Sequence, residues 1–70
     1  MNLELLNNII EAKGIRKEVI AAALNISLGG LRLKLIGESE FKVSEAVMLS
    51  KVLDLNNGEI LAIFFNFQLA

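Results

Sequence analysis

Apolar residues recur along this chain at intervals of three and four, which is the spacing that places them on one face of a helix. The first such segment predicts a helix from Leu3 to Lys13, and Gly14 is a natural residue to end it. The apolar side chains of this segment share one broad face, formed by Leu5, Leu6, Ile9 and Ile10. We expect this face to pack against the rest of the domain.

Two short helices joined by a three-residue turn are predicted next. The first runs from Lys17 to Leu24, and the small Ala21 lets a second helix cross it closely. Asn25 can adopt the left-handed backbone that ends a helix, and Ser27 is a good N-cap for the following helix, which ends at Gly37. The buried elbow and the apolar stripe of that helix are supplied by Ile26, Leu31 and Leu35.

The C-terminal half predicts two more helices. A loop with Phe41 tucked beneath it leads to a helix from Val43 to Leu53, and Asn56 and Glu59 then fit the spacing of a capping box for a last helix from about Asn57 to Phe65. The inward positions of the fourth helix are expected to be Val43, Ala46, Val47, Leu49, Ser50 and Leu53. The sequence therefore predicts an all-α fold of five helices in a single domain, residues 1–70.

The two short helices and their turn resemble the helix-turn-helix of the Cro and phage-repressor (XRE) family. The residues that carry the resemblance are Ile20, Ala21, Leu24, Ile26, Ser27, Leu31, Leu35 and Gly37. The resemblance implies a compact lambda-repressor-like domain whose third helix enters the major groove of double-stranded DNA, usually as a homodimer. It also implies a sequence-specific transcriptional regulator of phage or bacterial type.

A DNA-reading surface can be sought on the side of the third helix opposite Leu31 and Leu35. There, Arg32 could make a bidentate contact to guanine, and Leu33 could touch thymine methyl groups. Adjacent glycines would let the backbone approach a phosphate, and flanking cations would contact the DNA backbone. The candidate DNA-binding residues are Arg16, Lys17, Ser27, Leu28, Gly29, Gly30, Arg32, Leu33, Ile36 and Lys42.

The charge of the chain limits this hypothesis. Seven basic and eight acidic residues give a net charge of −1, so no general cationic field attracts nucleic acid. Affinity would depend on the local cations of the motif and its flanks, which are Arg16, Lys17, Arg32, Lys34 and Lys42. Because the outer face of the third helix is mostly aliphatic, an alternative function stays open: a helix-turn-helix scaffold that binds a protein through this face.

The C-terminal segment is apolar almost all round, which is more than one small domain can cover. We therefore expect the last helix and the tail, about residues 57–70, to form a homodimer. The candidate dimerisation residues are Ile60, Ile63, Phe64, Phe65 and Phe67.

Composition argues against several other classes. The chain has no His and no Cys, so it lacks the usual metal ligands and catalytic nucleophiles, and we expect neither an enzyme nor a cofactor, a metal site or a small-molecule substrate. No apolar run approaches the roughly 20 residues of a membrane span, and no signal peptide is evident. A cytoplasmic protein is therefore expected.

Overall fold

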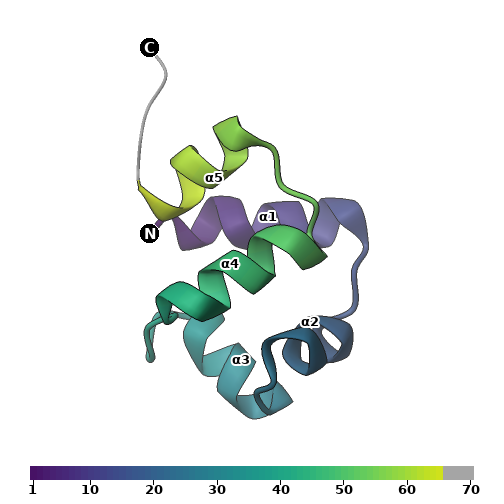
Figure 1. The fold of residues 1–70 in the computed structure, drawn as a ribbon. Coiled ribbons are helices and arrows are strands. Elements are labelled where there is room, and N and C mark those ends of the chain that lie inside the picture. The colour runs from purple at the N-terminus through teal and green to yellow at the C-terminus, as the bar shows by residue number, and fades with distance from the viewer. Residues whose placement is uncertain (66–70) are drawn as a thin grey trace.

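The computed structural model describes residues 1–65, and in this part of the chain all regular secondary structure is helical, without strands. The helices are α1 (Leu3–Lys13), α2 (Lys17–Leu24), α3 (Leu28–Leu35), α4 (Val43–Val52) and α5 (Asn57–Phe64). Figure 1 shows α2 and α3 at one end of the molecule and α5 at the other, with α1 and α4 between them. The predicted all-α class is confirmed.

Local capping signals set most of the helix ends. Gly14 and Asn25 end α1 and α2 in the left-handed region, with φ of 67° and 57°. Ser27 Oγ accepts a hydrogen bond from the Gly30 N–H at 2.9 Å and so caps α3. Asn56 and Glu59 form the predicted capping box at the start of α5. These are the residues that the sequence singled out.

Three helix ends differ slightly from the prediction. The helix α3 stops at Leu35 rather than Gly37, because Ile36 leaves helical geometry and Gly37 has a φ of +87°. The helices α4 and α5 each end one residue earlier than expected, at Val52 and Phe64. Differences of this size are normal where a last turn frays.

The core lies where all five helices meet, and α2 packs against both α3 and α4 while α1 packs against α5. Its buried apolar residues are Leu6, Ile10, Ile20, Ala21, Leu24, Leu31, Leu35, Leu49, Leu53 and Ile63. Phe41 is partly buried against this core from the α3–α4 loop, as predicted. The N-terminus is tied to α5 by a hydrogen bond from the Asn2 N–H to the Ile63 carbonyl at 2.7 Å.

The predicted orientation of α4 is partly wrong. Leu49 and Leu53 are fully buried as expected, but Val43 is 83% exposed and Val47 is half-exposed. The buried side of α4 instead begins with Glu45, four residues before Leu49. Because α4 has apolar residues on two sides, its sequence pattern does not decide which side faces the core.

Candidate nucleic-acid interface

The helix α3 has one buried side and one exposed side. Leu31 and Leu35 lie in the core, whereas Leu33 is 50% exposed and Ile36, at the C-cap, is 70% exposed. Arg32 is also exposed, and no residue among 1–65 forms an ion pair with it. The predicted outer face is therefore accessible from outside the domain, with a cation at its edge.

A hollow beside α3 brings two of the candidate cations together. It has a volume of about 380 Å³ and is lined by Asn7, Lys17, Arg32, Leu33, Leu35 and Ile36. Lys17 starts α2 and Arg32 lies on α3, so the two cations come from consecutive helices. This hollow, which we call the α2–α3 hollow, combines positive charge with aliphatic side chains.

The first turn of α3 contains two glycines, and the packing of the domain explains only one of them. A Cβ at Gly30 would lie 3.1 Å from Ser27 Oγ, so a side chain there would crowd the N-cap. A Cβ at Gly29 would meet no atom within 4 Å, and the φ of Gly29 is not in the left-handed region. The described fold therefore does not require glycine at position 29. The backbone there is exposed, so a partner could approach it closely. Leu28, at the start of the same turn, is half-buried.

The remaining candidate cations do not line this hollow. Arg16 Nε lies 3.3 Å from Glu18 Oε2 in an exposed pair, so part of its charge is offset locally. Lys42 is exposed at the N-cap of α4 and makes no capping hydrogen bond through its side chain. Ser27 is exposed, and its hydroxyl serves as the α3 cap.

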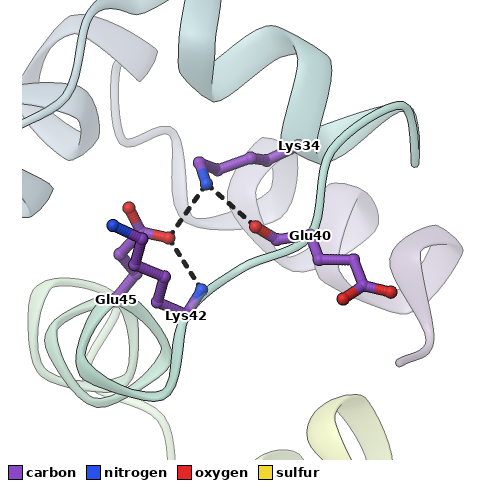
Figure 2. A network of polar contacts seen from close by, with 4 residues as sticks. All are labelled: Lys34, Glu40, Lys42 and Glu45. Atoms are coloured by element: carbon purple, nitrogen blue, oxygen red, sulfur yellow. Dashed lines mark hydrogen bonds and ion pairs between the residues drawn. The ribbon is translucent and has the colours of Figure 1, made fainter.

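Lys34, which we expected among the local cations of the motif, is occupied inside the domain. Its side chain is only 11% exposed, and its Nζ lies 3.0 Å from Glu45 Oε1. The same Nζ donates to the Glu40 carbonyl at 2.9 Å and lies 5.9 Å from the centre of the Phe41 ring. Figure 2 shows this network between α3, the following loop and the start of α4. Lys34 is therefore unavailable as a surface cation.

Glu45 completes the network and was missed by the sequence analysis. It is 7% exposed, and its Oε1 also accepts a hydrogen bond from the Lys42 backbone N–H at 2.8 Å. That backbone hydrogen bond is the main reason why the pKa of Glu45 lies below its ordinary value; burial opposes the shift, and Lys34 adds to it. The only sequence signal was a glutamate at the third position of a helix, which is typical of half a capping box.

A second exposed surface lies between α4 and α5. This α4–α5 groove has a volume of about 150 Å³ and carries no charged residue in its lining, which consists of Val43, Ala46, Val47, Ser50, Ile60, Phe64 and Phe65. Its single hydroxyl, on Ser50, donates within α4 to the Ala46 carbonyl at 2.9 Å. The groove is therefore an apolar surface.

The predicted dimerisation residues fall into three groups. Ile60, Phe64 and Phe65 line the α4–α5 groove, and Phe65 is 70% exposed. Ile63 is fully buried in the core, so we withdraw it from the dimerisation set: its side chain cannot meet a second chain while the domain is folded. Phe67 lies outside the described residues.

Two further classes of site are absent from residues 1–65. This part of the chain contains no group of three or more His, Cys, Asp or Glu side chains that could hold a metal ion. None of its helices has the length and apolar character needed to cross a membrane.

Comparison of the chain with protein-family models, with curated protein sequences and with solved structures finds no match.

Proposed function

We propose that this protein is a sequence-specific regulator that binds double-stranded DNA, with α2 and α3 acting as a helix-turn-helix and α3 entering the major groove. The proposal rests on the resemblance of Ile20–Gly37 to the Cro and phage-repressor family, and on one structural observation. That observation is the α2–α3 hollow, where Lys17 and Arg32 lie beside the exposed side of α3. Double-stranded DNA can satisfy both cations, because its phosphates can pair with Lys17 and its base edges can accept hydrogen bonds from Arg32.

Five of the candidate residues have a defined role in this proposal. Arg32 reads a guanine through two hydrogen bonds, and Leu33 and Ile36 contact thymine methyl groups. Lys17 contacts a phosphate, and the uncrowded backbone at Gly29 permits a close approach of the DNA strand. Because Lys34 is paired with Glu45, it contributes no phosphate contact.

We further propose that the protein acts as a homodimer through the α4–α5 groove, in which Phe65, at the C-cap of α5, is 70% exposed. A groove lined without charge can meet its own copy across a two-fold axis without burying like charges. A dimer would also present two copies of α3 to half-sites about one helical turn of DNA apart. No residue of α3 lines the groove, and α3 and α5 lie at opposite ends of the domain (Figure 1), so this interface does not use the outer side of α3.

The alternative function is a protein-binding module that uses the outer side of α3. It is favoured by the exposure of Leu33 and Ile36, two aliphatic side chains next to each other on that side. In this case Leu33→Gln and Ile36→Asn would abolish capture of a protein partner and leave the fold intact. Under the DNA proposal the same changes alter the preferred base sequence instead.

A salt titration distinguishes the two functions. Binding to random-sequence duplex DNA is measured by fluorescence anisotropy over a range of salt concentrations, for the wild type and for Lys17→Ala. Phosphate contacts give a linear fall of log K with log salt, and loss of one contact reduces the slope by about 0.9. Lys51→Ala is the matched control, because Lys51 is exposed in the last turn of α4, at the other end of that helix from Lys42. Absence of any salt-dependent binding would contradict the DNA proposal.

A further inference from the structure

The helix α3 is weakly held by apolar packing alone. It has eight residues, two of which are glycines, and only Leu31 and Leu35 are buried in the core. Contacts between aliphatic side chains are non-directional, so they oppose withdrawal of the helix more strongly than a small rotation about its own axis. The direction in which Arg32 points depends on that rotation.

Lys34 lies at the edge of the buried stripe where it can prevent such a rotation. Successive residues of a helix turn by about 100°, so Lys34 lies about 60° from Leu31 on one flank and Arg32 about 100° from it on the other. The Nζ of Lys34 is fixed by hydrogen bonds to Glu45 Oε1 and to the Glu40 carbonyl. Hydrogen bonds to charged groups are short and directional. They therefore fix the rotation of α3 about its own axis, which apolar contacts do not.

The receiving carboxylate is itself held in place. Glu45 Oε1 accepts both from Lys34 and from the backbone N–H of Lys42, the N-cap of α4 (Figure 2). One carboxylate oxygen therefore joins α3 to the first turn of α4. A second polar contact acts at the end of α3, where Asn7 Nδ2 donates to the Leu35 carbonyl at 3.1 Å. That contact ties α3 to α1 as well.

We infer that Lys34 and Glu45 are positioning residues, which set the orientation of α3 and thereby the aim of Arg32 and Leu33 at their partner. The inference rests on the proposed function for the nature of that partner. The pair touches no DNA in this arrangement, because both side chains are about nine-tenths buried. Its effect is on the discrimination between sequences rather than on general affinity.

The test uses a variant that removes the pair without leaving a buried charge alone. In Lys34→Met/Glu45→Gln, the methionine keeps the aliphatic stem and the glutamine oxygen can still accept from the Lys42 N–H. Replacing a buried ion pair by neutral groups is often neutral for stability, whereas removing one partner is strongly destabilising. Thermal unfolding confirms that the double variant is folded at the temperature of the binding experiment.

The DNA probes are a random-sequence duplex and the tightest duplex of about 20 base pairs that the wild type recovers from a random library, long enough for two half-sites. We expect the double variant to bind the random duplex within about twofold of wild type and the selected duplex about tenfold more weakly, which is the loss expected from one misdirected base contact. The single variant Lys34→Arg keeps an ion pair with Glu45 and should discriminate between the two duplexes as the wild type does. Wild-type discrimination by the folded double variant would overturn the inference.

A measurement without DNA separates this inference from the proposed function. If the wild type recovers no preferred sequence, the proposed function fails, and amide hydrogen exchange of the free protein then decides about the positioning role. We expect faster exchange at Leu31–Leu35 in the double variant and unchanged exchange at Leu6–Ile10 of α1. Equal exchange of α3 in both proteins would overturn the inference whatever the DNA result.

Discussion

The α2–α3 hollow and the α4–α5 groove are both exposed, and both contain aliphatic side chains, but only the first is charged. Lys17 and Arg32 line the hollow, whereas the groove lining contains no charged residue. Exposed apolar area alone therefore does not identify a partner. The two cations suit the hollow to a polyanion that also presents methyl groups, and their absence suits the groove to another apolar protein surface.

Substitutions at Ile63 and Phe65 should differ most in stability, because Ile63 lies in the core and Phe65 in the groove. Ile63→Ala should lower the free energy of unfolding by about 2–5 kcal/mol, because it empties a fully buried position. Phe65→Ser, only two residues away and largely exposed, should change the unfolding free energy of the monomer by no more than about 0.5 kcal/mol. Urea unfolding at low protein concentration measures both. Equal losses would contradict the burial of Ile63 and the exposure of Phe65.

The next effect concerns what covers the groove. Replacing Val43, Val47 and Phe65 together by serine should weaken dimerisation by about 3 kcal/mol, about a hundredfold in Kd, because apolar area is no longer removed from water. Sedimentation equilibrium of the wild type and the variant gives the two constants. A wild type that stays monomeric at high micromolar concentration, or a dimer that survives the triple change, would contradict the proposed interface.

Lowering the pH should reduce the free energy of unfolding by a smaller amount, through the network of Lys34 and Glu45. The pKa of Glu45 is lowered in the folded state, chiefly by the hydrogen bond from the Lys42 N–H, so the unfolded chain binds this proton more readily. The stability that Glu45 contributes is therefore complete above its ordinary pKa of 4.5 and is lost as the pH falls through the lower folded value. Denaturant unfolding as a function of pH should show a shallower acid decline for Glu45→Gln. An identical decline in both proteins would contradict this role.

A still smaller change tests whether the exposed backbone at Gly29, in the first turn of α3, contacts a partner. Gly29→Ala should raise the unfolding free energy by about 0.5 kcal/mol, because the added Cβ meets no atom and alanine favours the helix. The same change should weaken binding to duplex DNA if the backbone there approaches a phosphate. Gly30→Ala is the control, since its Cβ crowds Ser27 Oγ and should give no gain in stability. Unchanged DNA binding by Gly29→Ala would remove this position from the interface.

Local signals in the sequence predicted more of this molecule than long-range ones. Gly14, Asn25 and Ser27 each act on backbone groups within a few residues, so their capping roles could be predicted without the fold. The same holds for the exposure of Arg32 and Leu33, which follows from the helical period once Leu31 is placed inside. Arg32 and Leu33 are two of the six residues that line the α2–α3 hollow.

The remainder depended on how the helices pack. Val43 and Val47 share the period of a buried stripe, and only the packing of α4 against α2 shows that they face outward. The ion pair of Lys34 with Glu45 joins two helices across a loop, and the sequence around either residue does not predict it. Ile63 and Phe65 are both apolar and two residues apart, and only the tertiary structure assigns one to the core and the other to the surface.

Our main proposal is that Arg32, on the exposed side of α3, reads DNA. The direct measurement is competition between the duplex selected by the wild type and a random-sequence duplex, for the wild type, Arg32→Ala and Lys17→Ala. Arg32→Ala should lose about 1–3 kcal/mol of discrimination at one base pair, whereas Lys17→Ala should weaken binding to all sequences alike. Equal discrimination by the wild type and Arg32→Ala would contradict the claim.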